Sequence, residues 1–273
     1  MVNSNSNRFV WYELLTTNVS GAKAFYADVV GWGARDVSIP GAAYNFFTSG
    51  DTPVTAVMNL PQEMWRAGAM PCWMGYIRVD DVDAAVDRIT RLGGAVRVPP
   101  TTIPNISRFS VVADPQRATF VLVKGLQPNQ APFPDRDTPG RVGWHELFAA
   151  HWETAFVFYN KLFNWEKKGT DAGPTGPYQR FSAEEETIGA ISNKPPTMPV
   201  PFWLYYFNID DVEAAAKRVG AGGGHVNYGP VEVPGGAWIV HCTDPQGAIF
   251  GLLNRPKRKP IGYFIPAAAP SGA

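Results

Sequence analysis

The chain has 273 residues, and its 24 Lys and Arg residues balance 24 Asp and Glu residues, so the formal net charge is zero. Apolar residues make up 45% of the chain, which is typical of a folded globular protein and excludes a disordered one. The neutral balance argues against a nucleic-acid partner, and the lack of an apolar run of about 18 residues argues against a membrane partner. A polar start and only two cysteines, Cys72 and Cys242, favour a cytoplasmic protein without a disulfide framework.

In the first half of the chain, hydrophobic periodicity predicts two units of one kind, each a strand, a helix and three more strands. Asn18 or Ser20 is expected to cap the first helix, and Asp80 or Asp81 the second. Gly31 is expected to end the first helix. The predicted strands lie at 9–16, 33–38, 44–48, 54–59, 73–79, 95–98, 109–113 and 119–123.

The second half of the chain repeats the first at offsets of 130 to 134 residues. The paired motifs, in the same order in both halves, are Trp11-Tyr12-Glu13-Leu14 with Trp144-His145-Glu146-Leu147, Phe25-Tyr26 with Phe158-Tyr159, Gly31-Trp32 with Asn164-Trp165, Tyr44 with Tyr178, Asp80-Asp81-Val82 with Asp210-Asp211-Val212, and Asp114-Pro115-Gln116 with Asp244-Pro245-Gln246. Six matches in one order indicate two homologous modules.

We therefore predict an α+β fold of two tandem modules, at 8–124 and 142–255. In each module the paired units are expected to form a curved mixed sheet with a concave cup and with the helices outside. The Pro-rich stretch 125–141 is the predicted linker, and 256–273 is predicted to be a flexible tail. Whether the modules pair within one chain or between two chains of a homodimer is left open.

The order of these motifs resembles the vicinal oxygen chelate superfamily, which contains glyoxalase I, extradiol dioxygenases, and the bleomycin and fosfomycin resistance proteins. The resemblance rests on the two Phe-Tyr pairs, on the helix starts VDDVDAA and IDDVEAA, and on the two Asp-Pro-Gln turns, and it covers about 8–124 and 142–254. The Trp-x-Glu-Leu openings are more similar to a tandem glyoxalase-like subgroup than to glyoxalase I itself.

The resemblance also implies where metal ligands would lie, because family enzymes bind a divalent metal with His and Glu side chains on the concave face. The corresponding positions are Trp11, Met74 and Val121 in the first module and Trp144, Leu204 and Gly251 in the second. None of these residues offers the nitrogen or oxygen ligand that a hard divalent ion needs. We therefore predict no metal and no cofactor, and a divalent metal at an unrecognised site is the alternative.

Glu13 and Glu146 lie two residues beyond the first of these positions, so strand alternation places both on the concave face. As catalytic candidates, they would act as a base, or would hold a ligand amine or hydroxyl, in an apolar cup. Alternatively, each is a structural carboxylate paired with backbone amides or with an arginine, for which Arg78 is suited. Their presence in both modules favours the structural role.

The same alternation predicts which other side chains line the two cups. The candidate ligand-binding residues are Trp11, Tyr76 and Arg78 in the first cup, and Trp144, Tyr206 and Asn208 in the second. Their aromatic rings suit a small planar or hydrophobic ligand, or else they fill the space that a metal and substrate would occupy. His145 is expected to face the opposite way, beneath a helix or at a surface.

These residues predict a glyoxalase/bleomycin-resistance-like protein with degenerate metal positions, whose partner is a small, partly apolar molecule. One alternative is a metal-dependent lyase, isomerase or dioxygenase of the same superfamily. Another is an interaction protein whose cups are filled by its own side chains. Enzymatic activity is therefore left open.

Overall fold

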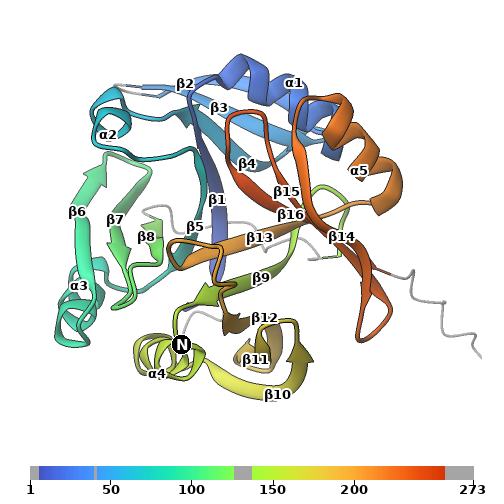
Figure 1. Ribbon diagram of the computed structural model, residues 1–273. Helices are drawn as coiled ribbons and strands as arrows, with labels where there is room; N and C mark the ends of the chain where they lie inside the picture. The colour runs from blue at the N-terminus through green and yellow to red at the C-terminus, as the bar shows by residue number, and fades with distance from the viewer. Residues whose placement is uncertain (1–5, 40–41, 126–136, 256–273) are drawn as a thin grey trace, which may run out of the picture.

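The structure is a computed structural model that describes residues 6–39, 42–125 and 137–255. It contains one eight-stranded mixed sheet in each half of the chain (Figure 1). The predicted linker and tail fall mostly on 126–136 and 256–273, which lie outside the described residues. No helix in the described part of the chain is long and apolar enough to cross a membrane.

The first module consists of β1 (Phe9–Thr16), α1 (Val19–Val30), β2 (Gly33–Ile39), β3 (Ala42–Ser49), β4 (Thr52–Asn59), α2 (Gln62–Arg66), β5 (Cys72–Arg78), α3 (Val82–Arg91), β6 (Ala95–Ile103), β7 (Ser107–Ala113) and β8 (Thr119–Gly125). Its strands follow the order β2-β3-β4-β1-β5-β8-β7-β6 across the sheet. The central strand β1 pairs parallel with β4 and antiparallel with β5.

The second module repeats this architecture. It consists of β9 (Val142–Ala149), α4 (Trp152–Phe163), β10 (Glu166–Gly173), β11 (Gly176–Ala183), β12 (Glu186–Asn193), β13 (Phe202–Asn208), α5 (Val212–Ala221), β14 (His225–Val233), β15 (Ala237–Thr243) and β16 (Ile249–Asn254). Its strand order, β10-β11-β12-β9-β13-β16-β15-β14, is the same as that of the first module. The predicted α+β fold of two tandem modules is confirmed.

The helix ends follow from the residues that cap them. Asn18 caps α1 by accepting a hydrogen bond from the Gly21 amide, and Asp81 caps α3 in the same way. Gly31 ends α1 in the left-handed region at φ 84°, where a side chain would be strained. Helix α2 was not predicted from the sequence, because it has no capping side chain and buries none of its residues.

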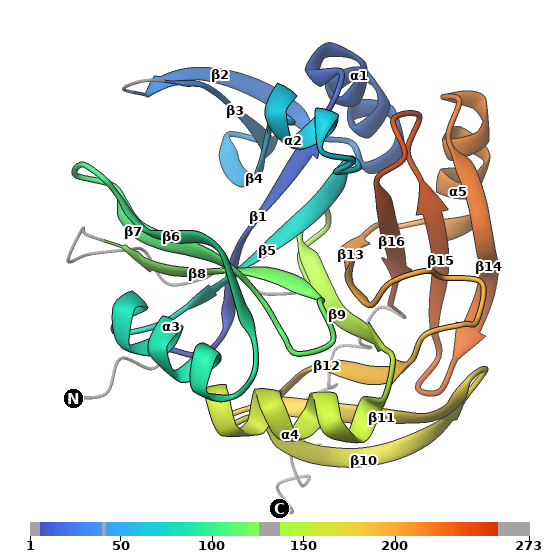
Figure 2. The same cartoon turned by 60° about the vertical axis from the view of Figure 1, so that its left-hand side comes forward.

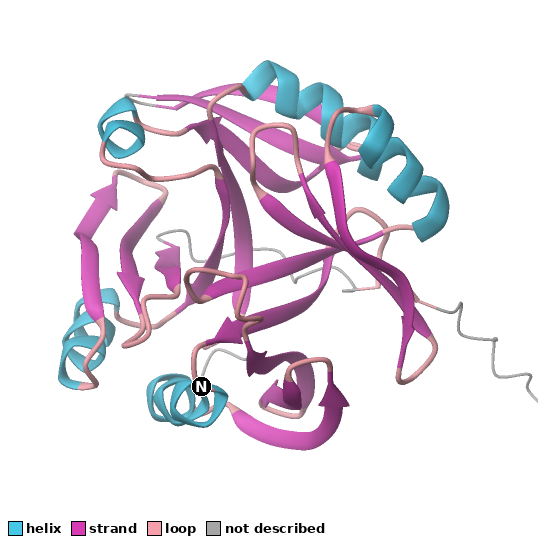
Figure 3. Cartoon of the chain, in the orientation of Figure 1, coloured by secondary structure: helices cyan, strands magenta, loops and turns pink. Residues whose placement is uncertain are grey.

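The two modules pack against each other through the helix-bearing faces of their sheets, and they share one hydrophobic core. Helix α1 lies beside α5, and α3 lies beside α4 (Figure 1, Figure 3). Strand β5 meets β13 between the modules (Figure 2), where the Tyr205 hydroxyl accepts a hydrogen bond from the Gly75 amide at 2.9 Å. A Cβ atom at Gly75 would lie 2.5 Å from that oxygen, so glycine permits the close approach. The modules therefore pair within one chain.

The repeated Phe-Tyr and Asp-Pro-Gln motifs contact each other across this interface. The Tyr26 hydroxyl of α1 donates to Asp244 Oδ2 of the second module at 3.2 Å. Reciprocally, the Tyr159 hydroxyl of α4 donates to Asp114 Oδ2 of the first module at 3.1 Å. All four residues are buried, so each hydrogen bond forms where water does not compete.

The repeated tryptophans make a second reciprocal pair of contacts. Trp32 Nε1 donates to the Gly140 carbonyl, just before β9, at 2.8 Å. Trp165 Nε1 donates to the Asn7 carbonyl, just before β1, at 2.7 Å. Each module thus fixes the chain that leads into the first strand of the other.

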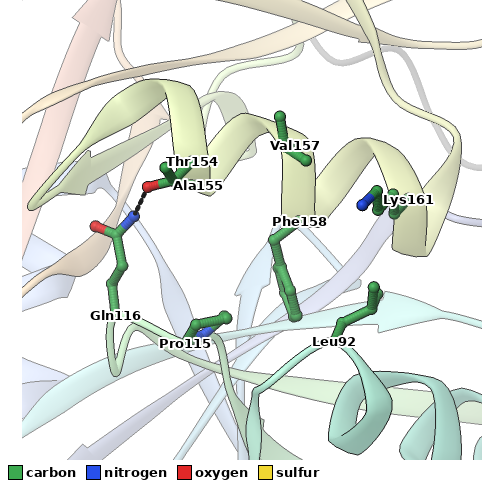
Figure 4. A pocket seen from close by; sticks show the side chains of 8 residues that line it. All are labelled: Leu92, Pro115, Gln116, Thr154, Ala155, Val157, Phe158 and Lys161. Carbon is green, nitrogen blue, oxygen red and sulfur yellow. Dashed lines mark hydrogen bonds between the residues drawn. The ribbon is translucent and has the colours of Figure 1, made fainter.

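A small pocket of about 170 Å³ lies at the seam between the β7–β8 turn and α4 (Figure 4). Gln116 Nε2 donates to Thr154 Oγ1 at 2.9 Å and to the His151 carbonyl at 2.8 Å, and Gln116 Oε1 accepts from the His151 amide. Leu92 and Phe158 supply its apolar walls. These contacts hold the two modules together, so we interpret this pocket as part of the interface.

The reciprocal tyrosine–aspartate contacts predict a stability effect. Tyr26→Phe and Tyr159→Phe should each lower the free energy of unfolding by about 1–3 kcal/mol, because each change leaves a buried carboxylate oxygen without its donor. Urea unfolding measures this loss. Tyr228→Phe is the control, because Tyr228 is 42% exposed, and it should change little. An equal effect of all three changes would contradict the prediction.

Candidate functional site

The concave face of the first module encloses a cavity of about 1600 Å³. Strand alternation places Trp11, Glu13, Met74 and Tyr76 on its floor, and Arg78 lies at one end of the same face. The β12–β13 connection of the second module also lines the cavity, through residues 198–201. The structure therefore brings together all the residues that the sequence suggested for the first cup.

The polar centre of this cavity is a buried carboxyl group held by tyrosines. The Tyr76 hydroxyl donates to Glu13 Oε2 at 2.5 Å, and Tyr44 also hydrogen-bonds to Glu13. Trp11 Nε1 donates to the Tyr44 hydroxyl at 3.3 Å. Burial raises the pKa of Glu13, and the hydrogen bonds from the two tyrosines oppose that rise only in part.

The expectation that Arg78 pairs with Glu13 is wrong. In the β1–β5 register Glu13 lies opposite Met74, and Arg78 lies four residues further along β5. The partners of Glu13 are hydroxyl groups instead, which leave the guanidinium of Arg78 at a separate place on the cavity wall. The sequence pattern placed both residues on one face, but it could not give their separation along the strands.

The second cup has an equivalent carboxyl group in a closed network. Glu146 accepts hydrogen bonds from the Tyr206 hydroxyl at 2.6 Å and from Ser192 Oγ at 3.0 Å. The Tyr206 hydroxyl also lies 2.7 Å from His241 Nε2. Burial raises the pKa of Glu146 to about 7 and lowers the pKa of His241 to about 4.

Side chains of the protein itself fill this second concave face. Tyr206 is 1% exposed and packs with Phe148, Leu204 and Leu253. Its ring lies over Gly251, where an added Cβ would come within 2.4 Å of the ring. The first module has Val121 at this position, opposite Tyr76, so the close approach of a tyrosine ring to this strand is possible only in the second module.

The other two candidates of the second cup also take part in internal contacts. Trp144 Nε1 donates to the Tyr178 hydroxyl at 2.8 Å. Asn208 Nδ2 donates to the Thr138 carbonyl at 3.2 Å, and its amide group packs against Gly143. A ligand-binding role for these residues stays a prediction, whereas their structural contacts are observed.

Sequence reasoning did not find His241, Ser192 or the role of Tyr44. Tyr44 and Tyr178 repeat at an offset of 134 residues, and that repetition was the available signal. His241 corresponds to Val111 in the first module, so no repeat pointed to it. His145 faces away from the cup, as expected, but it lies neither beneath a helix nor at a surface. It is buried between the modules, where it stacks on Phe9 at 4.3 Å and hydrogen-bonds with Tyr12.

The residues at the family's metal positions do not fit a divalent ion. Trp11, Met74 and Val121 all line the first cavity, and they offer an indole, a thioether and an isopropyl group. In the described part of the chain, no three His, Cys, Asp or Glu side chains come together as a metal-binding group. The concave face thus has one isolated carboxyl group where a metalloenzyme of this fold would need several ligands.

Comparison with known proteins places these observations in a family. The model of the "Glyoxalase/Bleomycin resistance protein/Dioxygenase superfamily" matches residues 8–122 and 141–252. The protein named "Putative glyoxylase CFP32" of Mycobacterium tuberculosis is 32% identical over 89% of this chain and 93% of its own length. The anthracycline biosynthesis protein DauV of Streptomyces sp. is 30% identical over 89% of this chain and 92% of its own.

Solved structures show the same fold at lower sequence identity. The Mn(II)-bound glyoxalase from Novosphingobium aromaticivorans has a TM-score of 0.61 at 16% identity, and the match covers 92% of this chain and 82% of that chain. The 2,3-dioxygenase LapB from Pseudomonas sp. KL28 has a TM-score of 0.61 at 11% identity, and the match covers 92% and 93% of the two chains.

The pKa of Glu146 predicts a pH-dependent stability. A carboxyl group whose pKa is raised on folding stabilises the protein below its unfolded pKa, and this stabilisation is lost as the pH rises through the folded pKa. The free energy of unfolding of Glu146→Gln minus that of the parent protein should therefore rise by about 3 kcal/mol between pH 4.5 and 7. Urea unfolding at several pH values measures this difference.

His241 supplies a control of opposite sign. Its pKa is lowered on folding, so its contribution is complete above pH 6.5 and is lost as the pH falls towards 4. The stability of His241→Gln relative to the parent protein should therefore rise as the pH falls. If both variants shift stability in the same direction with pH, these two pKa assignments are incorrect.

Proposed function

Because the chain belongs to the glyoxalase/bleomycin resistance protein/dioxygenase superfamily, we propose that it binds a small, planar, largely apolar molecule in the first module without a metal. The observation that carries this proposal is the contrast between the two cups. The first is an open cavity with one polar cluster on its floor, whereas the second is filled by its own tyrosine and its apolar neighbours. One ligand per chain is therefore expected.

The size and lining of the cavity support a polycyclic aromatic ligand. Its volume of about 1600 Å³ exceeds the roughly 300–1,000 Å³ of ordinary small-molecule pockets, so a body of several fused rings has room. The rings of Trp11, Phe46, Tyr76 and Phe109 offer stacking and edge contacts. The relative DauV is named for anthracycline biosynthesis, and a ligand of that chemical kind suits this lining.

Glu13 gives the ligand a fixed polar contact. Its carboxyl group is held by Tyr76 and Tyr44, so it adds directional hydrogen bonding to an otherwise apolar floor. A hydroxyl or amine group on the ligand would donate a hydrogen bond to this carboxylate, because a polar group buried in this cavity needs a partner. Glu13 can therefore have both roles: the structural role that its repetition in both modules favours, and ligand binding.

A second candidate function is a metal-independent acid–base reaction on the bound molecule. The observation that favours it is the raised pKa of a buried carboxyl group facing an open cavity, which suits a general acid or base. Nucleophilic catalysis by Cys72 is disfavoured, since burial raises the pKa of its thiol to about 11. The metal-dependent alternative would need ligands that the three metal positions lack.

The composition of the metal positions predicts the metal content of the purified protein. We expect no stoichiometric divalent ion, because Trp11, Met74 and Val121 cannot ligate one. Inductively coupled plasma mass spectrometry of protein purified without chelators measures this directly. One tightly bound Zn, Ni, Fe or Mn ion per module, lost on substitution of a concave-face residue, would overturn the metal-free proposal.

Ligand binding in the first cup is tested with anthracene-2-carboxamide, a neutral fluorescent probe. It should bind once per chain and quench tryptophan fluorescence, because Trp11 lies on the cavity floor. Val111→Trp should weaken binding at least about tenfold by filling the cavity, and Glu13→Gln should weaken it less, through one lost hydrogen bond.

Glu146→Gln is the matched control, because it changes the equivalent carboxyl group in the filled cup. It should leave the probe affinity unchanged. If Val111→Trp leaves the affinity unchanged while Glu146→Gln reduces it, the probe occupies the second module and the proposal is wrong.

A further inference from the structure

The charged residues around the first cavity are strongly unbalanced. Its lining contains three arginines, Arg78, Arg97 and Arg117, and one acidic residue, Glu13. The whole chain is neutral, so this excess of positive charge is local to the cavity. Most of the cavity wall is apolar, and most of its charged side chains are positive. Such a cavity is complementary to an amphipathic anion.

Arg78 is the cation placed best to bind such an anion. It is half-buried at the end of β5, beside Val123 of β8, which in turn lies beside Phe109 of β7. Arg97 and Arg117 are exposed at the rim. A guanidinium held among apolar side chains gains most from a carboxylate, which its planar fork binds through two parallel hydrogen bonds.

Arg78 differs from the arginines of the fold whose charge is neutralised by a carboxylate of the protein. Ion pairs to carboxylates are made by Arg8, Arg108, Arg180 and Arg255. Within the described chain, no acidic side chain forms an ion pair with Arg78, and its guanidinium lines the cavity. Half-burying an unpaired charge has a cost, which a bound anion would offset.

The second module shows that the fold itself does not require a cation here. Asn208 is the counterpart of Arg78, and it binds the Thr138 carbonyl in the chain that leads into β9. The neutral residue therefore occurs in the filled cup, and the arginine occurs in the open one. The positive charge thus occurs only in the cup that has space for a ligand.

We propose that the ligand of the first cavity is an aromatic acid whose anionic group pairs with Arg78, an inference that rests on the proposed function. Its ring body lies along Tyr76 towards Glu13, which binds a second polar substituent. Four strand residues separate the level of Glu13 from Arg78, a distance of about 13 Å along β5, so the two polar ends of the ligand are separated by a polycyclic body.

The test compares anthracene-2-carboxylate with the neutral anthracene-2-carboxamide, which has nearly the same shape. The parent protein should bind the carboxylate at least about tenfold more tightly, and raising the salt concentration should reduce this preference. Arg78→Gln should abolish the preference without weakening the amide, and Arg78→Lys should retain part of it. Fluorescence titration measures both affinities.

Arg97→Gln is the matched control, because it removes the same charge from the exposed rim of the same cavity. It should change the carboxylate affinity less than about twofold, as expected for an exposed charge. Equal affinity of the two probes for the parent protein would overturn this inference and leave the proposed function standing. Equal losses of both probes in Arg78→Gln would also overturn it, and failure of the amide to bind the cavity would overturn the proposed function itself.

Discussion

The structure depends on the reciprocal docking of its two halves through a buried tyrosine–aspartate pair. Asp114 has two roles: its Oδ1 accepts the amides of Gln116 and Ala118 in its own turn, and its Oδ2 accepts Tyr159 of the other module. Asp244 repeats this arrangement with Tyr26. One carboxylate therefore shapes the last hairpin of its module and also joins that hairpin to the partner module. The same side chain stabilises both the local turn and the packing of the two modules.

This arrangement explains why so much of the fold could be predicted from the sequence. A near-twofold interface requires the same residues on both sides, so its tyrosines, tryptophans and aspartates appear twice in the chain. Most of the motifs that repeat in the sequence are thus the residues through which the two modules pack against each other. Strand alternation then placed Trp11, Glu13 and Tyr76 on one face correctly, because a period of two depends only on the local backbone.

The difference between the two cups could not be predicted in the same way. It depends on which side chains meet across neighbouring strands, as Gly251 meets the ring of Tyr206. Val121 stands in place of that glycine in the first module, and no periodicity shows which of the two leaves a cavity open. The partners of Glu13 were missed for a related reason, because register along the strands, and not the face, decides between Tyr76 and Arg78.

The two glutamates show how one inherited residue acquires different surroundings. Glu146 is buried and is bound by a serine and by a tyrosine that also contacts a histidine, so its hydrogen bonds go to the protein itself. Glu13 keeps its tyrosine partners but faces open space. A duplicated module therefore retains its polar core group while the residues around that group decide whether it supports the fold or meets a ligand.

The shared core between the modules also has a consequence for synthesis on the ribosome. Trp32 of the first module donates to the Gly140 carbonyl, and Tyr26 donates to Asp244, which emerges more than two hundred residues later. The part of the convex face of the first sheet that its own helices leave free thus stays uncovered until almost the whole chain has left the exit tunnel. During that interval its aromatic side chains are exposed to chaperones and to other nascent chains, so slow translation of the second half prolongs the period in which the protein is prone to aggregate.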